Sequence, residues 1–110
     1  MIVATTETIA GQRILATRGQ VFGLAVRTRG LGGNIAAGFA RLPALDGDTM
    51  TEYTASLVEA RDEAIARMVA RASALRANAI VHMRFDTASV GYDMSEIVAY
   101  GTAVVIEPVP

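Results

Sequence analysis

The feature that most constrains this chain is a stretch from Thr49 to Val81 that contains no glycine and no proline. Its apolar residues recur at helical spacing and fill one broad arc of a helix. They are Tyr53, Leu57, Val58, Ala60, Ala64, Ile65, Met68, Val69, Ala72 and Leu75. Thr49-Met50-Thr51-Glu52 matches a capping box, and Arg76-Ala77-Asn78 ends the pattern, with Asn78 tolerant of a left-handed conformation. The stretch predicts one long amphipathic helix that turns directly into a strand.

Extended segments precede and follow this helix. Ile2-Val3 predicts a short edge strand, and Arg13 to Arg27 predicts a longer one, in which Gly19 and Gly23 indicate a bulge or a bend. Thr28 to Asp48 is less regular and predicts a loop with a short helix over Ile35 to Arg41. No phosphate-binding glycine motif is present in it.

The segment after the helix predicts an antiparallel hairpin from Ala79 to Asp86 and from Glu96 to Glu107. In the first strand, strict alternation places Ala79, Val81, Met83 and Phe85 on one face and Ile80, His82, Arg84 and Asp86 on the other. The second strand carries a row of mostly small residues on which an alanine-rich helix can pack: Ile97, Ala99, Gly101, Ala103 and Val105. These elements predict an α+β fold, with one long helix on a small, mostly antiparallel sheet. Residues 1–110 are expected to form a single domain.

Composition narrows the classes of function. The chain has 110 residues, of which 52% are hydrophobic, and an apolar fraction this high in a short chain favours self-association. The net charge of −1 gives no electrostatic reason to expect nucleic acid as a partner. Without cysteine there can be no disulfide, no thiolate nucleophile and no cysteine-based metal site. No signal peptide or membrane span is recognisable, so we expect a cytoplasmic protein without a membrane partner.

Arg61 breaks the apolar pattern, because it projects near the middle of the arc. An unpaired charge buried there would be very costly, which leaves three interpretations. Its stem packs on apolar surface while its head reaches the edge, or it binds an anion or takes part in catalysis. The third is a structural ion pair, within the chain or across an interface, with one of three carboxylates: Asp86, Asp93 or Glu96.

His82 is the only histidine and therefore the natural candidate for a metal ligand or a general base. It lies about 13 Å along its strand from Asp86, so these two residues cannot hold one ion. A metal site would need His82 together with Asp93 or Glu96, or with residues of another subunit. The simpler alternative is a polar strand face with an Arg84–Asp86 salt bridge. No catalytic motif is present, which favours a non-enzymatic protein and leaves a small enzyme as the alternative.

The chain also resembles a known family. Ala74-Leu75-Arg76-Ala77-Asn78-Ala79-Ile80-Val81 is similar to the A-L-G-A-D/N-A-V-V motif of the YbjQ-like family, whose description is "putative heavy-metal-binding". Further matches spread over nearly the whole chain: Thr5-Thr6, Gly11, Ile14, Gly19, Val21, Gly23, Asn34-Ile35, Glu52-Tyr53, Ala60-Arg61, Val90-Gly91 and Gly101-Thr102-Ala103-Val104. Arg76 and His82 stand where the family has or commonly has glycine. Arg76 therefore predicts a differently shaped helix end, and His82 adds a potential ligand or an interface residue.

The resemblance implies a β-α-β-β subunit of a ring-like homo-oligomer, a pentamer or a multiple of one. It implies a divalent transition metal as the cofactor to test, although no ligand set carries over residue by residue. The leading hypothesis is a non-enzymatic homo-oligomeric binding protein. The alternatives are a small-molecule binder or small enzyme with sites at subunit interfaces, lined by Arg61, His82 or Asp93, and a purely structural assembly module.

Overall fold

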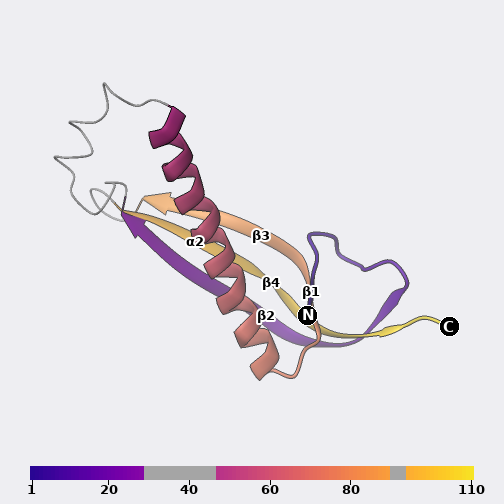
Figure 1. The fold of residues 1–110 in the computed structure, drawn as a ribbon. Coiled ribbons are helices and arrows are strands. Elements are labelled where there is room, and N and C mark those ends of the chain that lie inside the picture. Colours follow the sequence, from indigo (N-terminus) through magenta and orange to yellow (C-terminus); the bar gives the residue numbers. More distant parts are fainter. Residues whose placement is uncertain (29–46, 90–93) are drawn as a thin grey trace.

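A computed structural model of the chain describes residues 1–28, 47–89 and 94–110, with the side chains of 28 and 47–53 left out (Figure 1). The capping box, Asp93 and the predicted helix Ile35 to Arg41 lie outside the described side chains. The elements are β1 (Ile2–Val3), β2 (Gln12–Thr28), α2 (Gly47–Ala74), β3 (Ala79–Ser89) and β4 (Met94–Pro108). The predicted helix and strands are therefore present, and β3 runs three residues beyond its predicted end.

The strands form one sheet in the order β1-β3-β4-β2. β4 is central and pairs antiparallel with β3 on one side and with β2 on the other. β1 adds a short parallel pairing at the far side of β3. The helix α2 lies across one face of this sheet, mainly over β2 (Figure 1). This arrangement confirms the predicted α+β class with one helix packed on a mostly antiparallel sheet.

The main core lies between α2 and the sheet. Four helix residues one turn apart are fully buried: Ala60, Ala64, Met68 and Ala72. Beneath them, Ala99 and Ala103 of β4 belong to the same cluster, which confirms the predicted small-residue row. Small side chains on both surfaces allow the helix to approach the strands closely. No helix in the described part of the chain combines the length and the apolar content needed to cross a membrane.

The predicted alternation of β3 is wrong, because a β-bulge interrupts it. The pairing shifts between Val81 and Arg84, so that His82 and Met83 together lie opposite Gly101 of β4. His82 is the extra residue, with a left-handed φ of 55°. Ile80 therefore shares the face of Met83 and packs under α2, whereas Val81 faces the opposite side of the sheet. The amides of His82 and Met83 donate to the carbonyls of Thr6 and Ala4, which holds the segment after β1 against the bulge.

The helix ends in a Schellman motif, and its left-handed residue is Arg76 rather than Asn78. Arg76 has a φ of 63°, its amide donates to the Ser73 carbonyl, and the Ala77 amide donates to the Ala72 carbonyl. The helix end thus has the ordinary shape, and the expectation of a different one is corrected. Asn78 instead joins the sheet, because its side chain exchanges two hydrogen bonds with the backbone of Ile106, at 2.9 and 2.7 Å.

A second, smaller core lies on the sheet face turned away from α2. It is formed by Ala79 and Val81 of β3 with Val104 and Ile106 of β4, and Ile9 packs against it. Ile9 belongs to the segment between β1 and β2. This segment therefore covers one end of the face that α2 leaves open.

Candidate functional site

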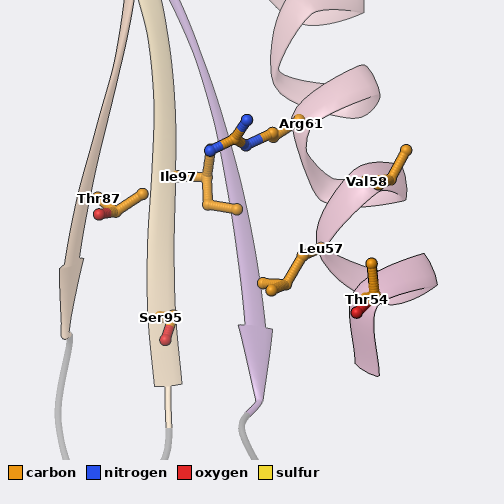
Figure 2. Close-up of a pocket in the computed structure, with 7 residues that line it drawn as sticks. All are labelled: Thr54, Leu57, Val58, Arg61, Thr87, Ser95 and Ile97. Atoms are coloured by element: carbon orange, nitrogen blue, oxygen red, sulfur yellow. The ribbon is translucent and has the colours of Figure 1, made fainter. Parts of the chain in front are cut away.

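A cavity of about 430 Å³ opens between the N-terminal part of α2 and the adjoining ends of β3 and β4. The helix contributes Thr54, Leu57, Val58 and Arg61, and the strands contribute Thr87, Ser95 and Ile97. Arg61 and Leu57 extend from the helix toward the strands, and Ile97 lies on the opposite wall (Figure 2). This volume falls within the range of small-molecule sites.

The cavity exists because α2 stands away from the strands toward its N-terminal end (Figure 1). From Ala60 onward the helix rests on the sheet, and its contacting residues are fully buried. One turn earlier, Leu57 is only half-buried and Val58 is 53% exposed. The apolar arc that the sequence predicts is thus present in this part, and the described side chains of Thr87, Ser95 and Ile97 line the space beneath it without filling it.

Arg61 faces the sheet, as the helical spacing predicts, yet its side chain is exposed in the cavity. Its guanidinium carbon lies 4.9 Å from the centre of the Phe85 ring of β3, a cation–π distance. Among the described residues it forms no ion pair, so neither Asp86 nor Glu96 supplies the predicted partner. Asp93 lies outside the described residues.

Two of the predicted metal ligands, His82 and Glu96, lie far apart on the sheet, and the third, Asp93, lies outside the described residues. His82 is half exposed at the bulge of β3, and its Nδ1 lies 3.9 Å from Oε1 of Glu7. Glu96 pairs with Ala88, six residues further along β3, which separates it from His82 by about 20 Å. No set of three potential ligands gathers anywhere in the described ranges. A metal site that uses both His82 and Glu96 would therefore need more than one copy of the chain.

Arg84 and Asp86 do not form the expected salt bridge in the structure. One Nη atom of Arg84 donates to the carbonyls of Thr5 and Met83, at 2.9 and 2.8 Å. Asp86 accepts a hydrogen bond from the Thr87 amide. Arg84 instead ties the segment after β1 to β3, next to the bulge.

An ionic cluster joins α2 to β2, the outer strand of the described sheet, and the sequence did not predict it as a whole. Glu63 binds Arg27 and Arg67, with both N–O distances at 2.5 Å. The hydrogen bond from Arg27 is the main cause that lowers the pKa of Glu63, and the charges of Arg27 and Arg67 add to it. Arg67 also donates to the Leu24 carbonyl on β2. The Glu63–Arg67 pair was visible as a helical i,i+4 spacing, but Arg27 comes from a distant strand.

A second feature is the uncovered part of the sheet, opposite α2. It consists of Phe22, Leu24 and Val26 of β2 beside Val98 and Tyr100 of β4, and we call it the outer sheet face. From α2, the guanidinium of Arg71 reaches this strip and lies 4.3 Å from the centre of the Phe22 ring. Phe22, Val26 and Tyr100 are 38%, 48% and 36% exposed. Charged residues adjoin this apolar strip: Arg84 and Asp86 on the neighbouring strand β3, and Glu96 on β4 itself.

Comparison with known proteins shows to which family the chain belongs. A family model described as "Putative heavy-metal-binding" (YbjQ) matches residues 1–107. The UPF0145 protein of Bradyrhizobium sp. (strain ORS 278) is 54% identical over 108 residues, covering 98% of this chain and 95% of that protein. The UPF0145 protein of Picrophilus torridus is 47% identical over 109 residues, covering 99% and 90%.

A solved structure shares the fold. The crystal structure of a protein of unknown function of the DUF74 family, from Pediococcus pentosaceus, superposes with a TM-score of 0.64 at 18% sequence identity. The match covers 97% of this chain and 98% of that one. The family model and the two relatives show that the chain belongs to the YbjQ family of UPF0145 proteins.

Proposed function

We propose that the protein is a non-enzymatic homo-oligomer, a ring of five copies or a multiple of five, in which another copy covers the outer sheet face. The observation that carries the proposal is the apolar strip of the outer sheet face, which no helix covers in the described part of the chain. A sheet with two apolar faces needs a layer on each of them.

The shape of the subunit supports this proposal. Its radius of gyration is 17.7 Å, whereas about 13 Å is expected for a compact chain of this length. The molecule measures 59 × 25 × 17 Å, so one dimension is only two layers thick. A chain this extended buries less of its own apolar surface than a compact one, and contact with further copies would compensate for the difference.

The charges beside the outer sheet face favour a second copy of this chain as the partner that covers it. Arg84 lies next to Tyr100, and the carboxylates of Asp86 and Glu96 lie next to Val98 and Val26. Since this surface carries both signs of charge around an apolar centre, two copies can offer each other opposite charges. A partner with a strongly acidic or basic surface would instead favour a strip flanked by one sign.

Light scattering of the purified protein tests the assembly. The proposal expects a mass of five protomers or a multiple of five, and a Tyr100→Glu variant that stays folded by circular dichroism but has a smaller mass. Val109→Glu is the control, because Val109 is also exposed but follows the end of β4, nine residues along the chain from Tyr100. A wild-type monomer, or equal masses for the wild type and Tyr100→Glu, would contradict the proposal.

Metal binding is a second candidate, supported by the family description and by the His82–Glu7 pair. Histidine nitrogen and carboxylate oxygen are both zinc ligands, but a structural zinc site has four protein ligands. His82 would therefore need donors from a neighbouring copy, such as Asp93 or Glu96. Calorimetric titration of the assembled protein with zinc, copper and nickel tests this, with His82→Ala expected to abolish the heat. No heat with any of the three metals would remove metal binding and leave the assembly untouched.

A further inference from the structure

We propose that the cavity beneath the N-terminal part of α2 is a binding site for a small monocarboxylate with an apolar tail. The cavity lies on the helix face of the sheet, on the opposite side from the outer sheet face. Its occupation therefore does not depend on the proposed assembly or on a metal.

The charge in the cavity points to an anion. Arg61 is the only ionisable group among its described lining residues, which include no carboxylate. Its guanidinium is positioned by the Phe85 ring, and contact with the ring face does not use the N–H donors. Those donors form a planar fork that matches a carboxylate with two parallel hydrogen bonds.

The walls point to an apolar tail. Leu57 and Val58 on the helix and Ile97 on β4 form the apolar part of the lining, with hydroxyl-bearing residues from both elements beside them (Figure 2). Ile97 is buried, so this wall is fixed by the sheet rather than by a mobile side chain. A largely apolar lining with one charged anchor is the usual construction of a small-molecule site, because the tail supplies affinity and the anchor supplies orientation.

Other ligand classes fit the lining less well. A phosphate dianion or a nucleotide would need further cations or a row of backbone amides, and the described lining offers one guanidinium. A metal ion would meet that positive charge, and the described lining residues include no carboxylate or histidine to bind it. A neutral apolar molecule would leave the guanidinium without a partner and would gain nothing from it.

Titration calorimetry with hexanoate tests the proposal on the assembled protein. Hexanamide, which has the same shape without the charge, should bind about tenfold more weakly or not at all. Arg61→Met should reduce hexanoate affinity by about tenfold or more, and Arg61→Lys should give an intermediate loss because it keeps the charge but not the fork.

Arg71→Met is the matched control. Arg71 lies on the same helix, and its guanidinium also stands over an aromatic ring, at 4.3 Å from the centre of Phe22, but it does not line the cavity. Hexanoate affinity should be unchanged in this variant. Methyl NMR signals of Leu57 and Ile97 should shift on titration, and those of Leu24 and Val26 on the outer sheet face should not.

Three results would overturn the proposal. These are equal affinities for hexanoate and hexanamide, unchanged hexanoate affinity in a folded Arg61→Met protein, and tighter binding of inorganic phosphate than of hexanoate. Light scattering measures the mass of the protein separately and tests only the proposed homo-oligomer. Failure of the carboxylate site can therefore be distinguished from failure of the assembly.

Discussion

Gly23 of β2 lies directly beneath Ala64 of α2. A Cβ atom placed on Gly23 would collide with the Ala64 carbonyl oxygen and would lie 2.5 Å from the amide nitrogen of Met68. Both obstacles are backbone atoms of a helix, which cannot move without shifting the whole element. Gly23 is thus not the bulge or bend that its place in a strand predicts. It is the position that sets the distance between helix and sheet.

Gly23→Ala should lower the free energy of unfolding by about 1–3 kcal/mol, because one added methyl group overpacks this contact. Urea unfolding followed by circular dichroism measures it. Gln20→Ala, at an exposed position of the same strand, should change stability by no more than about 0.5 kcal/mol. Equal effects of the two substitutions would show that the helix can lift away from β2 at no cost.

Arg76→Gly should raise the free energy of unfolding by about 1 kcal/mol. The backbone φ of 63° is costly for any residue with a Cβ, and the Schellman hydrogen bonds around it do not involve its side chain. Asn78→Gly should act in the opposite direction and cost about 1–3 kcal/mol, since it removes both hydrogen bonds to Ile106. Thermal unfolding of the two variants should therefore shift in opposite directions, and a destabilised Arg76→Gly protein would refute this account.

His82 should respond differently to two small replacements. His82→Gly relieves the left-handed conformation and should stabilise the protein by about 1 kcal/mol. His82→Val should destabilise it by a similar amount, because a β-branched side chain is strongly disfavoured at positive φ. Differential scanning calorimetry distinguishes the two, and indistinguishable melting temperatures would mean that the bulge rearranges on substitution.

Glu63→Gln should lower stability at neutral pH and have no effect in acid. The pKa of Glu63 is lowered in the folded protein, chiefly by the hydrogen bond from Arg27. The contribution of Glu63 to folding stability is therefore complete above its ordinary pKa of 4.5. It is lost as the pH falls through the lowered pKa of the folded protein. Unfolding curves of the wild type and the variant should converge as the pH drops below 4.5. Glu59→Gln, at an exposed position of the same helix, should match the wild type at every pH.

Periodicity predicted those parts of the fold that depend on one element at a time. The helical spacing identified the face of α2 that carries Ala60 and Ala64, and the alternation of β4 identified Ala99 and Ala103 as its bed. Both patterns keep the same spacing of apolar residues along the part of the element that forms the core, so each can be identified from one segment alone. The direction of Arg61 toward the sheet followed from the same reasoning.

The predictions were wrong or incomplete where the conformation of a residue depends on two elements of the fold at once. The bulge at His82 is defined by what lies opposite it on β4, and single-strand alternation contains no sign of it. Apart from glycines, the described residues with positive φ are Arg76 and His82. Residues with a Cβ are uncommon in this conformation, and the sequence pattern predicted it for Asn78 instead. The cavity at Arg61 depends on how far α2 stands from the sheet, which no local pattern encodes.

The central position of β4 has a consequence for how the chain is made. β4 pairs with β3 through a short connection, but it also pairs with β2, so that Thr28 meets Met94 and Gln12 meets Pro108. Since all of α2 and β3 is translated between these partners, β2 leaves the ribosome long before its only described neighbouring strand exists. Pairing so distant in sequence is slow to form. During synthesis, we therefore expect the apolar stretch around Phe22 and Val26 to stay unpaired until β4 has been made, which favours aggregation of the incomplete chain.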